Sequence, residues 1–208
     1  MSKIHFQPWI GKNYGKPNYL NKKIMVLGES VYCGEYCSPC DGCSLFTIDR
    51  VTEYLHNDIY DEQGAYRGWA KTYKKFESAL IGRRLAIEER PLVWESIIFY
   101  NYFQTALDKA RQPLGGKLEY DRATECLRKV LEKYQPEVVI AWGNRLWECL
   151  DDKDWTNGPV IEHDGCISYT GFYTIGEKKS SCMSIYHPSS GFSWEGWHKN
   201  IKEFIENS

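Results

Sequence analysis

Four cysteines gathered in one short segment are the first residues of this sequence whose types and spacing suggest chemistry. Cys33, Cys37, Cys40 and Cys43 are separated by three, two and two residues. Thiolates at such spacing can hold a zinc ion or give three ligands to an iron-sulfur cluster. Two interpretations stay open: a structural metal, zinc rather than iron-sulfur, or free thiols in a loop. In neither case do we expect a cofactor that catalysis requires.

Polar side chains that can act as bases or hydrogen-bond donors lie at the ends of apolar runs. Glu29 and Ser30 follow one run, Asn101 lies near the end of a second, and His187 follows a third. A carboxylate can orient water, a neutral imidazole can stabilise a developing oxyanion, and an amide offers both a donor and an acceptor. These side chains are therefore the candidate site residues of the sequence.

Secondary-structure elements that would bring these side chains together can be predicted from hydrophobic patterns. Apolar or β-branched runs predict buried parallel strands at residues 22–28, 96–103, 137–142 and 182–186. Helical spacing predicts helices at about 48–55, 68–80, 121–134, 144–150 and 197–207, with Asp121 as the N-cap of the third. The alternation predicts an α/β fold, a three-layer α/β/α sandwich around a mainly parallel sheet of about four strands. Ligands of such sheets bind off the carboxyl ends of the strands.

Four short motifs at these predicted strand ends resemble those of the uracil-DNA glycosylase superfamily. In chain order they are Gly28-Glu29-Ser30-Val31-Tyr32-Cys33, Phe99-Tyr100-Asn101, Ile140-Ala141-Trp142-Gly143 and Tyr186-His187-Pro188-Ser189-Ser190. The first is similar to Gly-Gln-Asp-Pro-Tyr-His of the best-known branch and to Gly-Glu-x-Pro-Gly of the iron-sulfur branches. The last is similar to the His-Pro-Ser loop of the family. The resemblance implies a uracil-DNA glycosylase-like fold that hydrolyses the N-glycosidic bond of uracil or a related modified base in DNA by base flipping.

The resemblance also implies roles for individual residues. His187 would stabilise the leaving base, Asn101 would read its edge, and Glu29 would orient water. Gly28, Ser30, Tyr32 and Phe46 would form the substrate pocket, where Phe46 stacks on the flipped base and Tyr32 excludes a 5-methyl group. The departure is Ser30, which stands where the best-known branch carries a water-activating Asp and which cannot act as a carboxylate base.

Contacts with DNA are expected from the segment after His187. Ser189 and Ser190 offer hydroxyls and amides to phosphates, and Phe192 or Trp194 would be the wedge that replaces the extruded nucleotide. The alternative for Trp194 is packing of the last helix.

Two other functional classes stay open at this point. One is a non-catalytic DNA- or base-binding protein of the same fold, which would bind uracil or abasic DNA without cutting it. The other is a metal-dependent nucleotide-processing enzyme organised by the cysteine segment, which metal analysis would reveal.

The composition of the chain limits the class of protein that these motifs can belong to. The 208 residues carry 26 Lys and Arg against 28 Asp and Glu, so the net charge of −2 does not itself indicate a nucleic-acid partner. The apolar fraction of 42% is typical of a folded domain, and the 8 Trp, 15 Tyr and 8 Phe favour ring stacking. We expect one domain over residues 1–208 with a Cys-rich loop at 33–43. We further expect a cytoplasmic protein with no membrane partner, because no apolar run approaches the length of a membrane span. We also expect a monomer.

Overall fold

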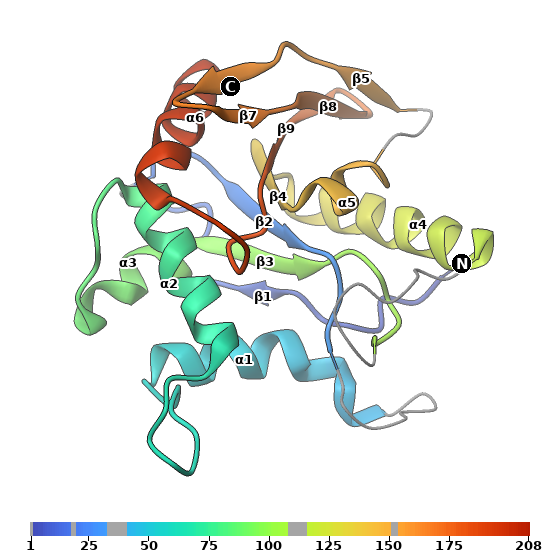
Figure 1. The fold of residues 1–208 in the computed structure, drawn as a ribbon. Coiled ribbons are helices and arrows are strands. Elements are labelled where there is room, and N and C mark those ends of the chain that lie inside the picture. The colour runs from blue at the N-terminus through green and yellow to red at the C-terminus, as the bar shows by residue number, and fades with distance from the viewer. Residues whose placement is uncertain (1, 18–19, 33–40, 108–115, 151–153) are drawn as a thin grey trace.

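A seven-stranded sheet forms the centre of the computed structural model, which describes residues 2–17, 20–32, 41–107, 116–150 and 154–208 (Figure 1). The strand order is β1 (Trp9–Ile10), β3 (Ile97–Asn101), β2 (Ile24–Gly28), β4 (Val138–Trp142), β9 (Lys178–Ile185), β8 (Thr170–Ile175) and β5 (Trp155–Asn157). β3, β2, β4 and β9 are parallel to one another, whereas β1, β8 and β5 pair antiparallel with their neighbours. A separate two-stranded ribbon pairs β6 (Ile161–His163) with β7 (Cys166–Ser168).

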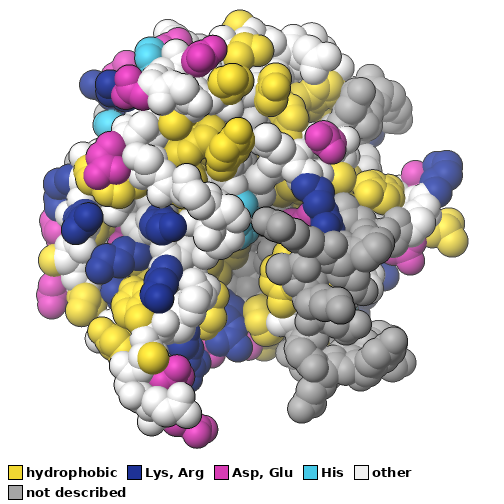
Figure 2. Space-filling view, viewed as in Figure 1, with side chains coloured by type: hydrophobic (Ala, Val, Ile, Leu, Met, Phe, Trp, Pro, Cys, Tyr) yellow, Lys and Arg dark blue, Asp and Glu magenta, His cyan; other side chains and the backbone are white. Residues whose placement is uncertain are grey.

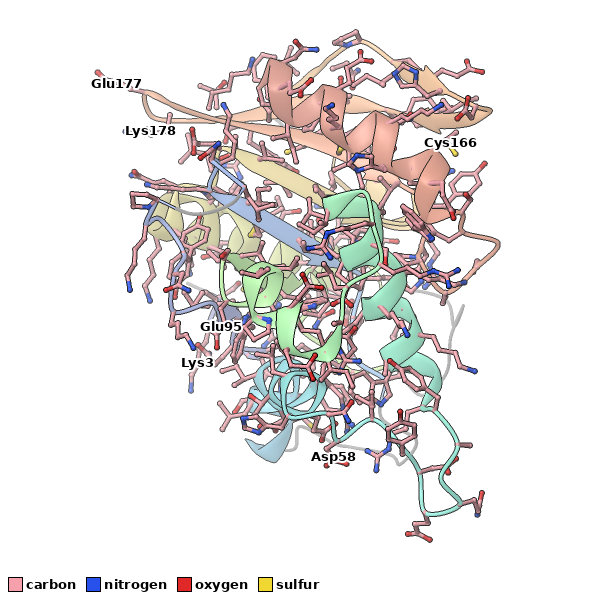
Figure 3. All side chains as sticks on the ribbon, turned by 90° about the vertical axis from the view of Figure 1, so that its left-hand side faces the viewer. Lys3, Asp58, Glu95, Cys166, Glu177 and Lys178 are labelled. Carbon is pink, nitrogen blue, oxygen red and sulfur yellow. The ribbon has the colours of Figure 1, made fainter. Side chains whose placement is uncertain are left out.

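Helices cover both faces of the sheet. α1 (Phe46–Leu55), α2 (Gly68–Ile81), α3 (Arg90–Trp94) and α6 (Trp194–Asn207) contribute to one hydrophobic core with strand residues such as Val26 and Ile140. α4 (Lys117–Tyr134) and α5 (Asn144–Trp147) contribute to a second core with Met25 and Leu27. Short 3-10 helices precede α1 and α3, at Asp41–Leu45 and Ile87–Glu89. Figure 3 shows the molecule from the side that carries α2 and α6.

Coverage of both faces explains the sequence pattern of the central strands. Every residue of β2, β3 and β4 is buried. A strand covered on both sides needs a continuous apolar run rather than an alternating one. The α/β class and the four predicted strands are therefore confirmed, and these four strands form the parallel centre of the sheet.

The sheet is larger than the predicted four strands because antiparallel strands extend both edges. β8 and β5 extend the edge beside β9, and β1 pairs with β3 at the other edge. These strands escape a search for apolar runs because they are short or partly exposed, and β5 has one half-buried residue followed by two exposed ones.

Two helices begin earlier than their patterns predict. α4 begins at Lys117 after Gly116, so the prediction of Asp121 as its N-cap is wrong. Asp121 instead lies one turn into the helix, where its carboxylate pairs with Lys117 Nζ at 2.7 Å. α6 begins at Trp194, and Ser193 Oγ accepts the Gly196 N–H at 3.3 Å as the true cap.

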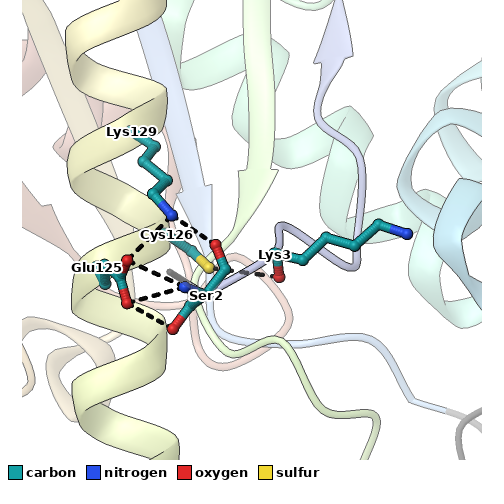
Figure 4. Close-up of polar contacts among 5 residues, drawn as sticks. All are labelled: Ser2, Lys3, Glu125, Cys126 and Lys129. Atoms are coloured by element: carbon teal, nitrogen blue, oxygen red, sulfur yellow. Dashed lines mark hydrogen bonds and ion pairs between the residues drawn. The ribbon is translucent and has the colours of Figure 1, made fainter.

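The N-terminal segment is fastened to the second helical layer (Figure 4). The backbone N–H and hydroxyl of Ser2 donate to the Glu125 carboxylate of α4, and Lys129 Nζ donates to Ser2 O. Further along, Gln104 Oε1 accepts the N–H groups of His5 and Phe6. The segment therefore reaches β1 along a fixed path.

Candidate active site

A pocket of about 840 Å³ opens at the carboxyl ends of the four parallel strands. The chain passes from β2 to β3 on one side, and the connection from β3 then crosses back to β4 on the other side of β2, so the strand order reverses between β2 and β4. Such a switch point leaves a crevice above the strand ends. Glu29, Asn101, Trp142 and His187, which come from all four strand ends, line this pocket.

The loop after β2 is fixed by the loop after β3. Carbonyl oxygens of Gly28, Glu29 and Val31 each accept an N–H from residues 102–107 at 2.9 Å. Ser30 is buried, and its hydroxyl donates to Thr105 O at 2.6 Å. The hydroxyl of Ser30 therefore holds the two loops together, although Ser30 also lines the pocket.

Asn101 ends β3 with its side chain buried and oriented. Its Nδ2 donates to Thr47 Oγ1 of α1 at 2.8 Å. Gly28 lies directly beside it in the parallel register, and a Cβ at Gly28 would come within 2.7 Å of Asn101 Oδ1. The missing side chain at Gly28 is thus what gives the Asn101 amide its space.

Glu29 is held by an ion pair and a hydrogen bond. Arg145 Nε of α5 lies 2.7 Å from Glu29 Oε1, and the Tyr32 hydroxyl donates to Oε2 at 3.2 Å. The Glu29 side chain is 12% exposed. Burial, with the nearby Glu29 carboxylate adding to it, raises the pKa of Tyr32 to about 12, so this phenol stays a donor at neutral pH.

His187 follows β9 and is neutral at physiological pH, because burial lowers its pKa to about 4. The ring lies edge-on to Trp142, with centroids 5.9 Å apart. Its Nδ1 accepts the backbone N–H of Ser189 at 3.3 Å and lies 2.7 Å from Ser189 Oγ. A backbone N–H can only donate, so Nδ1 is unprotonated and Nε2 carries the hydrogen of the ring.

Aromatic rings and cations of α1 and α2 form the opposite wall. Phe46, Arg50 and Trp69 line the pocket, and the Arg50 guanidinium lies 4.7 Å from the Phe46 ring centroid and 5.5 Å from that of Trp69. Lys71 and Lys75 line the same wall. Tyr32, from the loop after β2, lines the pocket together with Phe46.

Sequence reasoning missed four residues of this arrangement, Thr47, Arg50, Arg145 and Gln104. Gln104 is buried and bridges the site to the N-terminal segment, because its Nε2 donates to Asn101 O. Arg145 carried a weak signal, since it closely follows the strand-end residues Trp142 and Gly143. Thr47 had none, because its contact with Asn101 spans 54 positions.

The segment expected to contact DNA divides into exposed and packed residues. Ser189 and Ser190 are exposed. Phe192 is 7% exposed and stacks on Trp197, with centroids 5.8 Å apart and ring planes 10° apart. Trp194 is half-buried at the start of α6 and packs against the core, as the alternative for this residue had it. Phe192 in this position is not available as a wedge, because a wedge must project from the surface.

Three of the four cysteines in the predicted metal segment, Cys33, Cys37 and Cys40, lie outside the described residues. Cys43 is half-buried in the 3-10 helix before α1. Within the described ranges, no three His, Cys, Asp or Glu side chains are grouped to hold a metal ion. The zinc and iron-sulfur interpretations of the cysteine segment stay predictions.

The other cysteines lie in the core or at its edge. Cys126 and Cys182 are buried, and Cys149 and Cys166 are half-buried. Burial raises the pKa of Cys149 to about 11, which disfavours the reactive thiolate. In the part of the chain that the structure describes, no helix is long and apolar enough to cross a membrane.

Comparisons with known proteins add little to this geometry. No family model matches the chain, and no curated protein matches it. One similar solved structure is a domain of unknown function (DUF1537) from Bordetella bronchiseptica, with a TM-score of 0.39 and 10% identity. The match covers 89% of this chain and 41% of that one, so the chain spans less than half of that structure.

Proposed function

We propose that the protein is a DNA glycosylase with a uracil-DNA glycosylase-like three-layer fold, which hydrolyses the N-glycosidic bond of uracil or a related modified base in DNA. One observation carries the proposal. Glu29, Asn101 and His187, assigned three different roles from the resemblance, line a single pocket at the carboxyl ends of parallel strands. Aromatic rings border the same pocket and suit a planar base.

Asn101 reads the flipped base in this proposal. An amide offers a donor and an acceptor, which match the two polar groups on the edge of a pyrimidine such as uracil. Thr47 holds the amide through Nδ2, which leaves the second N–H and Oδ1 for the base. An oriented amide selects one hydrogen-bonding pattern because it cannot rotate to match another.

His187 stabilises the leaving base through a hydrogen bond. Departure of the base leaves negative charge on its ring nitrogen and carbonyl oxygens, and a donor placed beforehand lowers the barrier. The neutral ring donates from Nε2, because Nδ1 accepts from Ser189. With its pKa lowered to about 4, His187 is suited to donating a hydrogen bond rather than to transferring a proton.

Glu29 acts on the sugar and the attacking water. The sugar becomes positively charged in the transition state as the bond to the base breaks, and a fixed carboxylate stabilises that charge. Arg145 forms an ion pair with one oxygen of Glu29 and Tyr32 donates to the other, and the remaining lone pairs can orient water. Ser30 takes no part as a base, because its hydroxyl is committed to Thr105.

A base-release assay tests the proposal. Labelled oligonucleotides carrying uracil, hydroxymethyluracil, hypoxanthine or a modified cytosine are incubated with the protein, and alkali then cuts at abasic sites. We expect release of one of these bases, with losses of at least a hundredfold in His187→Ala and Asn101→Ala. His56→Ala, which changes an exposed histidine that does not line the pocket, is the matched control and should keep full activity.

One observation favours a second candidate, a base-binding protein without hydrolysis. Both oxygens of Glu29 contact protein groups, one in the ion pair with Arg145 and the other in the hydrogen bond from Tyr32, and Ser30 stands where the best-known branch carries its Asp. Tight binding of abasic or uracil DNA by a folded protein that releases no base from the four substrates would select this candidate.

A further inference from the structure

A basic stretch of α2 forms one wall of the pocket and has no role in the chemistry proposed above. Lys71 and Lys75 both line the pocket. Residues four apart lie on one face of a helix, about 6 Å apart along its axis. Figure 2 shows Lys and Arg side chains gathered on the part of the surface that carries α2.

Neither lysine has an ion-pair or hydrogen-bond partner among the residues that the structure describes. Other lysines do, since Lys117, Lys199 and Lys202 each pair with an acid. A cation that forms no such pair favours the binding of an anion, because no internal partner must first be displaced.

The acids among the described residues that line the pocket do not neutralise this wall. Glu29 is the one carboxylate among the described lining residues, and it is paired with Arg145. Arg50 lines the pocket too but pairs with Glu53. The charge of the wall therefore comes mainly from Lys71 and Lys75, in a chain whose net charge is −2.

Resting on the proposed function, we propose that Lys71 and Lys75 bind two successive phosphates of the DNA strand whose base enters the pocket. The distance between the two lysines along the helix is similar to the distance between neighbouring phosphates in a DNA strand. A free base or nucleoside has no such pair of phosphates. Phosphate contacts fix the register of the strand without reading its sequence. The pair would thereby set which nucleotide faces Asn101.

DNA binding tests the proposal. The probe is a fluorescent 15-nucleotide DNA with a tetrahydrofuran abasic site, used as a single strand and annealed to its complement. Its affinity is measured by fluorescence anisotropy between 50 and 200 mM salt. The double variant Lys71→Gln/Lys75→Gln should weaken binding at least tenfold at 50 mM salt. It should also reduce the slope of log affinity against log salt by about 1.4 for the single strand. Lys71→Arg/Lys75→Arg should keep binding, because the charge is kept.

Lys199→Gln/Lys202→Gln is the matched control, since it removes the same charge from exposed lysines of α6. Equal loss in both Gln double variants, an unchanged salt slope in Lys71→Gln/Lys75→Gln, or no binding by the unaltered protein would overturn the proposal. The base-release assay is separate. Binding that depends on Lys71 and Lys75 without release of any base would contradict the glycosylase and leave this inference standing. Release of a base by the unaltered protein, with an unchanged salt slope in Lys71→Gln/Lys75→Gln, would support the glycosylase and contradict the role of the two lysines.

Discussion

Asn101 Nδ2 donates a hydrogen bond to Thr47 Oγ1 over 2.8 Å, and both side chains are buried. Thr47→Val removes this acceptor and keeps the branched shape of the side chain. An unpaired buried donor costs about 1–3 kcal/mol, and the freed amide no longer holds one orientation. We expect a loss of at least tenfold in base release, with a lower free energy of unfolding in urea. Thr52→Val on the same helix is the control, and equal losses in the two variants would contradict the link to Asn101.

Gly28→Ala should disturb the same amide from the other side. The added methyl group would lie 2.7 Å from Asn101 Oδ1 and 3.3 Å from the Phe99 ring. Overpacking of this kind costs about 1–3 kcal/mol, and we expect base release to fall with it. Gly68→Ala is the matched control for overpacking, because Gly68 also lines the pocket but a Cβ there meets no atom within 4 Å. Thermal melting and the base-release assay should separate the two variants, and similar behaviour would show that Gly28 needs no open space.

The ion pair between Glu29 and Arg145 should matter more for activity than for stability. Its two side chains are 12% and 36% exposed, and pairs that water reaches contribute at most about 1 kcal/mol. If Arg145 acts by holding Glu29, the variant Arg145→Ala should lower the rate, and adding Glu29→Gln to it should lower the rate little further. Additive losses in this double-mutant cycle would mean that the two residues act independently.

His187 should make folding stability depend on pH in a defined window. Its pKa is about 4 in the folded protein and 6.5 in a free side chain. The unfolded chain therefore takes up a proton on this ring below pH 6.5, whereas the folded chain does so near pH 4. The stability due to the neutral ring is present above pH 6.5 and is lost as the pH falls toward 4. Urea unfolding of His187→Asn should show a shallower dependence over this window, and exposed His56 changed to Asn serves as the control.

Glu77 should make folding stability depend on pH in the opposite direction to His187. Burial raises its pKa from 4.5 to about 7, while Trp94 Nε1 donates to its Oε2 at 3.0 Å. The unfolded chain loses this proton above pH 4.5 and the folded chain near pH 7, so stability falls as the pH rises through that range. Glu77→Gln should remove this decline when unfolding in urea is compared at pH 5 and pH 8. An unchanged difference between the two pH values would show that the carboxyl is ionised in the folded protein.

The central strands were predictable because a strand buried on both faces needs a continuous apolar run. The long helices were predictable because their apolar residues recur at helical spacing. The positions of Glu29, Asn101 and His187 at strand ends followed from the same runs. Edge strands were not predictable, because β5 and β8 alternate weakly and are stabilised by pairing with distant neighbours.

The residues that contact the site side chains could not be predicted from the sequence for a related reason. Thr47 meets Asn101 and Arg145 meets Glu29 through tertiary contacts, which no local spacing encodes. For Phe192, a local motif led to a wrong prediction of exposure. Its place after the His-Pro-Ser motif suggested an exposed wedge, but stacking on Trp197 of α6 determines where the ring lies.

The sheet ends at both described edges in very short antiparallel strands, β1 with two residues and β5 with three. An exposed parallel strand such as β3 would offer a row of free backbone groups to another chain, and brief edge strands leave little of such a template. Ser2, through Glu125, helps to keep β1 in place. Because β1 pairs with Ile98 and Phe99 of β3, we expect the N-terminal segment to limit association of the protein through this edge of its sheet. Removal of residues 1–10 should show this as growth of aggregates in light scattering.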